Sequence, residues 1–272
     1  VITPPSVPHI AYIHTPMRYA WDQFFEYQKR SKKIVAFFMN KFMPSIRLWD
    51  FVSSQRIDSL IANSKYIQRR IKKYWNLGSK VIYPPVDTER LCPNGLEPED
   101  FYVVFSRFVP YKRIDLAISA CGELGRKLVV IGGGSQEKEL KALAAKYKGA
   151  DIKFTGRISD SEVQDYLMRC RAMIFSAEED FGIIPVEAQA CGRPVIAFAK
   201  GGSLETVIDG KTGVFFREQK TESVMQAIEE FETLEKQKCF NPTEISSHAK
   251  SFSTERFCTQ IKDEIEQTLK KF

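Results

Sequence analysis

From Glu99 onward, the hydrophobic positions of the chain switch repeatedly between a period of two and a helical period. Short runs rich in β-branched and aromatic residues predict strands at 101–105, 127–131, 151–154, 172–175, 195–198 and 214–216. The segments between them have helical spacing, and the one from Ser159 opens with a Ser-x-x-Glu capping box ending at Glu162. Strand, helix and strand in strict succession predict an α/β fold with a mostly parallel sheet covered on both faces. Such sheets bind ligands outside the carboxyl ends of their strands.

The front of the chain has fewer strand patterns. Only 9–13 and 59–62 read as strands, and a long helical region rich in Phe, Lys and Arg separates them. Because two strands cannot bury a doubly wound core, and because the chain starts at Val1 rather than Met, we expect the latter half of a larger domain whose first strands lie upstream. A run with two prolines at 83–87 predicts a hinge. We therefore expect a partial N-terminal domain at 1–82, a second domain at 83–250, and a C-terminal helix at 251–272 that packs back toward the first.

Composition and cysteine usage narrow the class of protein. The chain has 272 residues, enough for two domains, and its 43% hydrophobic and 27% charged content excludes a disordered tail. No apolar run approaches the roughly 18 residues of a membrane-spanning helix. The six cysteines are scattered without a Cys-x-x-Cys pair, which favours a reducing, cytoplasmic location.

The charge is distributed unevenly. Residues 1–80 carry a net charge of +10 and the remainder −4, which indicates one surface that meets an anionic partner. A nucleic-acid partner is not expected, because no recognition helix or aromatic platform is visible. Residues 29–39 place cations beside aromatic and aliphatic groups, as in a helix lying on the anionic inner face of the cytoplasmic membrane. The alternative is an ordinary core-facing helix with a solvated face.

The stretch from Glu179 to Glu187 carries the most specific chemistry. It follows a predicted strand, contains Gly182, and enters a helix with Pro185 in its first turn. The first amides of a helix favour anions, and flanking carboxylates accept hydrogen bonds from hydroxyls. A sugar nucleotide offers hydroxyls on both sides of a diphosphate. The alternative is a pair of surface glutamates flanking a turn.

Other loops add cations and exclude some cofactors. Arg107 and Lys112 lie in the loop after the first strand of the second domain and suit a diphosphate, although a solvated basic loop is the alternative. His14 directly follows a front strand. The triple glycine at 132–134 is only part of a dinucleotide fingerprint, which disfavours a nicotinamide or flavin enzyme. There is no Asp-x-Asp pair to hold a divalent metal on a diphosphate.

Together these residues resemble family 4 of the retaining glycosyltransferases, whose GT-B fold has two facing Rossmann-like domains. The resemblance covers about 82–213, and its most specific element is the E-x7-E motif formed by Glu179 and Glu187. The supporting elements are Ser106-Arg107-Phe108 with Lys112, Phe154-Thr155-Gly156-Arg157, the segment 190–197, and Gly201-Gly202 with Glu205. The front, Tyr12 to Tyr19 with Trp21-Asp22, looks like the family's bacterial mannosyltransferases of O-antigen and related polysaccharides.

The resemblance implies a role for each matching residue. The implied catalytic set is Glu179 on the transferred sugar, His14 beside it across the cleft, and Arg107 and Lys112 on the donor diphosphate. The implied donor-binding set is Phe181, Gly182 and Ile183 around the sugar and phosphate, Glu187 on the ribose, and Gly156, Arg157 and Ile158 at the base. Ser106 departs from the glycine of many members, and the family's Gly-rich first loop of the acceptor domain is absent.

The function implied is a retaining, metal-independent transfer of a hexosyl group to a saccharide or polyprenyl-linked acceptor. The resemblance favours mannosyl transfer from GDP-mannose, with a UDP-sugar as the other donor, and implies no cofactor. It implies attack from the face of the leaving group, whose phosphate takes the acceptor proton. The alternative function is a non-catalytic nucleotide-sugar-binding module or an inactive fragment of such an enzyme.

Overall fold

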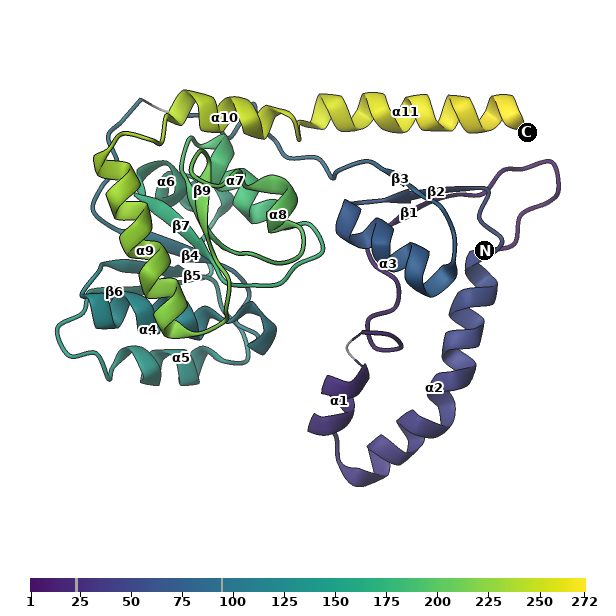
Figure 1. The fold of residues 1–272 in the computed structure, drawn as a ribbon, viewed down its shortest axis with the longest axis horizontal. Coiled ribbons are helices and arrows are strands. Elements are labelled where there is room, and N and C mark those ends of the chain that lie inside the picture. Colours follow the sequence, from purple (N-terminus) through teal and green to yellow (C-terminus); the bar gives the residue numbers. More distant parts are fainter. Residues whose placement is uncertain (23, 94) are drawn as a thin grey trace. The chain divides into compact units, whose positions relative to one another are not determined.

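The computed structural model describes residues 1–22, 24–93 and 95–272 (Figure 1). The chain divides into two compact units, of which unit 1 combines Val1–Tyr83 with Phe257–Phe272 and unit 2 is Pro84–Arg256. Each unit contains a parallel sheet with helices packed on it, so the predicted α/β class is confirmed.

Unit 2 is built on a sheet with the strand order β6-β5-β4-β7-β8-β9. Its strands are β4 (Tyr102–Phe105), β5 (Leu128–Ile131), β6 (Ile152–Gly156), β7 (Ala172–Phe175), β8 (Val195–Phe198) and β9 (Gly213–Phe216). Every neighbouring pair is parallel, as the alternation of periods predicted. The strand ends match the predicted runs to within two residues. Except in β6, these runs are mostly buried and their apolar pattern is continuous, whereas β6 has no fully buried residue and shows the largest difference.

The helices of unit 2 follow the strands in turn. They are α4 (Ile114–Leu124), α5 (Glu137–Ala144), α6 (Asp160–Arg169), α7 (Ile183–Ala190), α8 (Ser203–Thr206), α9 (Thr221–Lys236) and α10 (Pro242–Lys250), with the 3₁₀ turn η1 (Pro110–Lys112) before α4. The predicted capping box is confirmed: the Ser159 hydroxyl accepts from the Glu162 amide, and the Glu162 carboxylate accepts from the Ser159 amide. This cap fixes the point at which the chain leaves β6 and enters α6.

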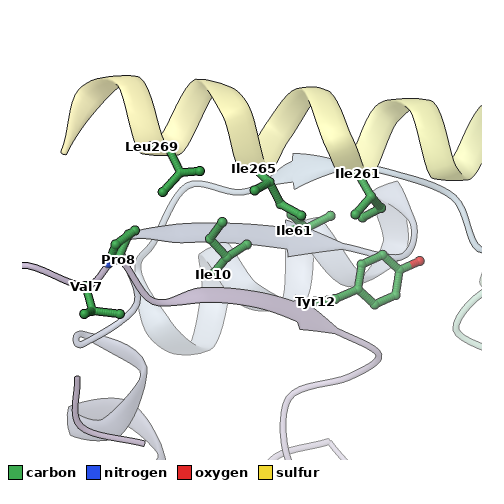
Figure 2. Close-up of a pocket in the computed structure, with 8 residues that line it drawn as sticks. All are labelled: Val7, Pro8, Ile10, Tyr12, Ile61, Ile261, Ile265 and Leu269. Carbon is green, nitrogen blue, oxygen red and sulfur yellow. The ribbon is translucent and has the colours of Figure 1, made fainter. Parts of the chain in front are cut away.

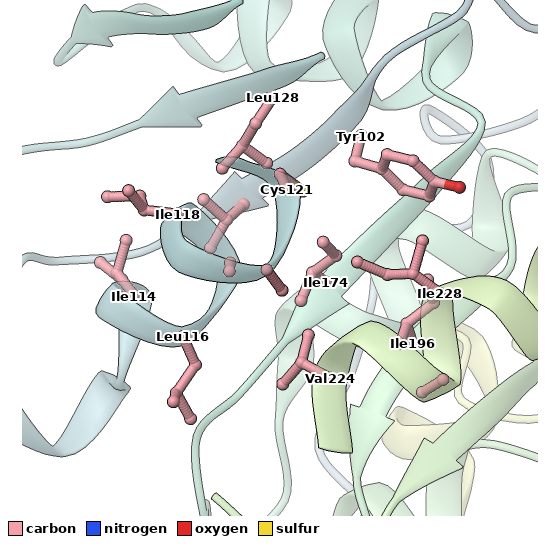
Figure 3. Packing of buried hydrophobic residues seen from close by; sticks show 14 of the residues in the cluster. Tyr102, Ile114, Leu116, Ile118, Cys121, Leu128, Ile174, Ile196, Val224 and Ile228 are labelled. Atoms are coloured by element: carbon pink, nitrogen blue, oxygen red, sulfur yellow. The ribbon is translucent and has the colours of Figure 1, made fainter. Parts of the chain in front are cut away.

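A buried apolar cluster holds α4 and α9 on one face of the sheet (Figure 3). Successive strand side chains point to opposite faces, so Tyr102 and Val104 of β4 share this face with Ile174 of β7. They pack with Ile118 of α4 and Ile228 of α9, both fully buried. Complete burial of an Ile side chain is worth about 1.5–3 kcal/mol. The cluster therefore fixes both the central strands and the loops that leave them.

Unit 1 has a smaller sheet with the order β1-β2-β3. Its strands are β1 (Ile10–Ile13), β2 (Ser59–Ala62) and β3 (Lys80–Val81), of which β3 was not predicted because two residues carry no detectable period. The helix α3 (Lys65–Trp75) packs on one face, where Leu60 and Ala62 join a buried cluster with Ile67 and Ile71.

The C-terminal helix α11 (Thr254–Lys271) packs on the other face of this sheet (Figure 2). Its Glu264 carboxylate accepts from the Ser59 hydroxyl at 2.7 Å and pairs with the Lys80 ammonium at 2.8 Å. Between helix and sheet lies an apolar cavity of about 520 Å³. It is lined by Ile261, Ile265 and Leu269 on the helix side and by Ile10, Tyr12 and Ile61 on the sheet side.

The predicted basic helix at 29–39 is wrong as a single helix. The chain forms α1 (Phe24–Arg30) and α2 (Lys33–Ser54), separated by Ser31 and an extended Lys32 at φ −60° and ψ 148°. Lys29 and Lys33 would repel each other one helical turn apart, and lysines at the start of α2 oppose its dipole. Within the described part of the chain, no helix is both long and apolar enough to cross a lipid bilayer.

Candidate functional site

The strand order of unit 2 creates a topological switch point between β4 and β7. The chain leaves β4 for β5 and β6 on one side and later returns to place β7 on the other side. The ladder between β4 and β7 ends at Val103 and Met173, whereas the ladder between β4 and β5 continues to Phe105 and Ile131. Ligands of open parallel sheets bind in the crevice outside the carboxyl ends at such a point. The loops after β4 and β7 are therefore the candidate site.

An ion pair joins these two loops. The Lys112 ammonium, at the end of η1, pairs with a carboxylate oxygen of Glu179 in the loop after β7. Their side chains are only 12% and 21% exposed, so the pair is well shielded from solvent. The Lys112 ammonium also lies 5.3 Å from the centre of the Tyr111 ring. Two residues expected to contact a donor separately thus contact each other in the free protein.

The backbone around Glu179 is held by a second loop. The Gly202 amide donates to the Glu179 carbonyl at 2.8 Å. A Cβ atom added to Gly201 would lie 2.2 Å from that carbonyl oxygen, and one added to Gly202 would lie 2.2 Å from the Phe181 Cα. Only glycine permits this approach at both positions. The loop after β8 therefore sets the position of Glu179.

The turn from Phe181 into α7 presents backbone amides. Gly182 caps the helix at φ 84°, a left-handed conformation that favours glycine. Within the described residues, the amides of Gly182 and Ile183 have no hydrogen-bond acceptor. Free amides at a helix start attract anions. The turn thus offers donors directly after the Glu179 loop.

Glu187 lies four residues into α7 and is half-buried. Burial raises the pKa of its carboxyl, while the Arg90 charge lowers this pKa and the Asp160 charge raises it. Asp160 begins α6, directly after the loop that contains Gly156, Arg157 and Ile158. The charge at the start of α6 therefore influences Glu187.

The loops after β5 and β6 lie beside each other. A Cβ added to Gly132 would be 2.0 Å from the Ser106 carbonyl oxygen, and one added to Gly134 would be 2.5 Å from the Phe108 carbonyl oxygen. These glycines are thus required for packing against the loop after β4. A Cβ at Gly133 would lie 3.7 Å from the side chain of Arg157. Gly156, at φ 74°, faces open space, Arg157 is exposed and Ile158 is half-buried.

Two members of the predicted catalytic set are not joined to the ion pair. Arg107 follows Ser106 in the loop after β4, and its exposed side chain makes no ion pair with any described residue. His14 belongs to unit 1, where it follows β1, is exposed, and lies 5.3 Å from the Tyr12 ring. Their contribution to the site stays a prediction.

The sequence did not predict several neighbours of the site. Arg90 and Asp160, which act on Glu187, are far from it in sequence and carry no motif. Ser176 follows β7 as Ser106 follows β4, and this shared position after a buried strand was the signal available for it. Among the described residues, no three His, Cys, Asp or Glu side chains gather where they could hold a metal ion.

Comparison with known proteins supplies independent evidence. The family pattern described as glycosyl transferases group 1 matches residues 92–245. An uncharacterized glycosyltransferase of Methanocaldococcus jannaschii is 31% identical over 172 residues, which cover 63% of this chain and 48% of that protein. A GDP-mannose-dependent alpha-(1-6)-phosphatidylinositol monomannoside mannosyltransferase of Mycolicibacterium smegmatis is 33% identical over 170 residues, covering 53% of this chain and 44% of the relative. The chain thus spans about half the length of these relatives.

The fold also matches solved structures. The HepE protein of Anabaena, crystallised with UDP and glucose, superposes with a TM-score of 0.75. The match covers 95% of this chain and 71% of that chain at 19% identity. This likeness supports the predicted GT-B type of fold.

Proposed function

Because the chain belongs to the glycosyl transferases group 1 family, we propose that it transfers a hexosyl group from a nucleotide-diphosphate sugar to a saccharide or lipid-linked saccharide. The observation that carries the proposal is the Lys112–Glu179 ion pair at the switch point, beside the free amides of Gly182 and Ile183. It combines a cation and amide donors for a diphosphate with a carboxylate for sugar hydroxyls.

The proposed chemistry is leaving-group stabilisation. Sugar transfer passes through a cationic sugar while the departing diphosphate gains negative charge, so fixed positive groups lower the barrier. Lys112, Arg107 and the amides of the turn at Phe181 to Ile183 would supply them without a metal. Donor binding would part the ion pair, because Lys112 turns to the diphosphate and Glu179 to the sugar hydroxyls.

We propose retention of anomeric configuration, as in family 4. Glu179 would bind sugar hydroxyls and not form a covalent intermediate. The acceptor would then attack from the face of the leaving group, whose phosphate takes the proton. His14 would lie beside the donor sugar.

The rest of the donor would extend along α7 toward α6. Glu187 would accept hydrogen bonds from the ribose hydroxyls. Because half-burial disfavours the charged form of this carboxyl, these hydrogen bonds would stabilise that form. Gly156, Arg157 and Ile158 would seat the base, since Asp160 next to this loop influences Glu187.

We propose GDP-mannose as the donor. The named Mycolicibacterium relative, which uses GDP-mannose, supports this choice, whereas the structural neighbour with UDP and glucose supports a UDP-sugar as the other candidate. The alternative function is a nucleotide-sugar-binding module without turnover.

We also propose that unit 1 contacts an anionic membrane through α2. The helix exposes Phe37, Phe38, Phe42 and Trp49, the first of them 63% exposed, beside exposed lysines. Its one carboxylate, Asp50, is buried and accepts from two tryptophan indoles at 2.7 Å. The exposed surface of α2 is therefore aromatic and basic without a negative charge, which suits anionic headgroups. A polyprenyl-linked acceptor would be found at such a surface.

The experiment that tests the proposed function is a transfer assay with GDP-mannose or UDP-glucose, with and without a saccharide acceptor and in EDTA. Lys112→Ala should lower turnover roughly 100- to 1,000-fold without unfolding the protein, since one lost leaving-group donor costs about 2.7–4 kcal/mol. Lys127→Ala is the matched control, because Lys127 directly precedes β5 and so lies at the amino ends of the strands, away from the candidate site. Wild-type turnover by Lys112→Ala, or activity that EDTA abolishes, would contradict the proposal. Donor binding without any turnover would favour the binding module.

A further inference from the structure

Two buried serines at the switch point have hydroxyls without a partner. Ser106 directly follows β4 and Ser176 directly follows β7, and they are 8% and 2% exposed. Among the described residues, neither side-chain oxygen has a hydrogen-bond partner. A buried hydroxyl without a partner costs free energy, so two of them in neighbouring strands require an explanation.

The topology brings these two residues to the ends of neighbouring strands. β4 and β7 pair in parallel through Tyr102 with Ala172 and Val103 with Met173. Ser106 directly follows the last residue of β4, and Ser176 directly follows the last residue of β7. Both serines therefore stand at the carboxyl ends of the two central strands.

The same two residues begin the loops that carry the ion pair. Lys112 lies six residues after Ser106, and Glu179 lies three residues after Ser176. One backbone group of each serine has a partner: the Ser106 amide donates to the Ile131 carbonyl at 3.1 Å, and the Ser176 carbonyl accepts from the Gln219 side chain at 2.8 Å. The two buried hydroxyls have no partner among the described residues, and each can donate one hydrogen bond.

We propose that Ser106 and Ser176 are donor-positioning residues whose hydroxyls bind phosphate oxygens of a nucleoside diphosphate once the Lys112–Glu179 pair parts. A diphosphate oxygen is a charged acceptor without a proton of its own, which makes it a strong partner for a hydroxyl. The inference rests on the proposed function, because the diphosphate belongs to the donor. It adds a contact that depends on neutral side chains and not on Arg107 or Lys112.

The test is calorimetric titration of GDP, UDP and the matching nucleosides into wild-type protein, Ser106→Ala and Ser176→Ala. Each variant should bind the nucleoside diphosphate roughly tenfold more weakly and the nucleoside equally well, since a hydrogen bond to a charged group is lost. The melting temperature of the free variants should be unchanged or raised, because an unsatisfied buried hydroxyl has been removed. Ser54→Ala is the matched control: Ser54, in unit 1, is also buried, but its hydroxyl already donates to the Phe51 carbonyl at 2.7 Å. That variant should melt at a lower temperature and keep its nucleotide affinity.

The outcomes separate this inference from the proposed function. If wild-type protein binds neither nucleoside diphosphate, both fail. If it binds one and the two serine variants bind it equally well, only the positioning role is overturned. Lower melting temperatures of both serine variants with unchanged affinity would assign the hydroxyls to a structural water and also overturn it.

Discussion

Burial of the Glu187 carboxyl affects the stability of the free protein. Burial raises the pKa of this carboxyl above its unfolded value, and Arg90 only partly offsets the effect. A carboxyl with a raised folded-state pKa adds stability below its unfolded pKa and loses that contribution as the pH rises through the folded pKa. At neutral pH the ionised Glu187 therefore destabilises the free protein, and a bound ribose would compensate for its desolvation.

Glu187→Gln should accordingly raise the melting temperature of the free protein at neutral pH. The difference from wild type should shrink as the pH falls toward the unfolded pKa of a glutamate, about 4.3, because the wild-type carboxyl with its raised folded-state pKa takes up its proton before that pH is reached. The same variant should bind the nucleotide more weakly, because the amide cannot accept from both ribose hydroxyls as a carboxylate does. Thermal melts across pH, with and without nucleotide, measure both effects. A variant less stable than wild type at neutral pH would refute the electrostatic account.

At the scale of residues, sequence reasoning found groups but not their pairing. Glu179, Glu187, Arg107 and Lys112 were nominated by type and spacing. That Lys112 contacts Glu179 could not be predicted, because the contact depends on β4 and β7 being neighbours in the sheet. The neighbours of Glu187 depend on the packing of α6 and α7 in the same way.

At the scale of elements, the buried strands of unit 2 were predictable and the front helices were not. A run such as Ala172–Phe175 is apolar and fully buried, so its limits are visible in the pattern. The break between α1 and α2 depends on charge repulsion and on a single extended residue, Lys32, which periodicity does not reveal. The loop at Gly201-Gly202 packs against the backbone of the Glu179 loop and holds it in place.

Gly202→Ala should displace the Glu179 loop. The added Cβ would lie 2.2 Å from the Phe181 Cα, so the backbone at 179–181 must move. We expect kcat to fall at least tenfold, since an error of about 1 Å in placement costs up to 100-fold. Gly78→Ala, whose Cβ would meet nothing within 4 Å, is the control and should keep wild-type kcat. Steady-state kinetics with circular dichroism checks both variants. An active, folded Gly202→Ala protein would argue against the positioning role of this loop.

From the exposed aromatic and basic face of α2 we predict that the protein binds to anionic membranes. Vesicles of phosphatidylcholine with phosphatidylglycerol should bind the protein, and vesicles of phosphatidylcholine alone should bind it less, because the lysines need anionic headgroups. Phe38→Glu with Phe42→Glu should abolish flotation, since both rings are about half exposed. Leu204→Glu, on α8 of unit 2, is the matched control because Leu204 is also about half exposed, and it should float as wild type does. Equal binding to both vesicle types, or no binding, would remove the membrane proposal.

In the whole molecule, the positive charge and the candidate site residues are distributed unevenly between the two units. The groups proposed to bind the donor, from Lys112 to Glu187, all belong to unit 2, whereas His14 and the exposed face of α2 belong to unit 1. The basic front of the sequence and its mildly acidic remainder correspond to this division. The proposed function requires that the Lys112–Glu179 ion pair is the free state of a donor site and not a structural bond.

The most direct test of that claim compares GDP and UDP affinity in Lys112→Ala and Glu179→Gln by calorimetry. In the free protein the Glu179 carboxylate pairs with the Lys112 ammonium and so competes with a diphosphate for it. Glu179→Gln removes this competing charge and should therefore bind the nucleoside diphosphate more tightly than wild type. Lys112→Ala should bind it more weakly. Glu178→Gln is the matched control, because it removes an equal charge from the preceding residue, whose carboxylate pairs with the Lys200 ammonium at 2.9 Å. It should change the affinity less than Glu179→Gln does. Weaker binding by Glu179→Gln, or unchanged binding by Lys112→Ala, would contradict the account.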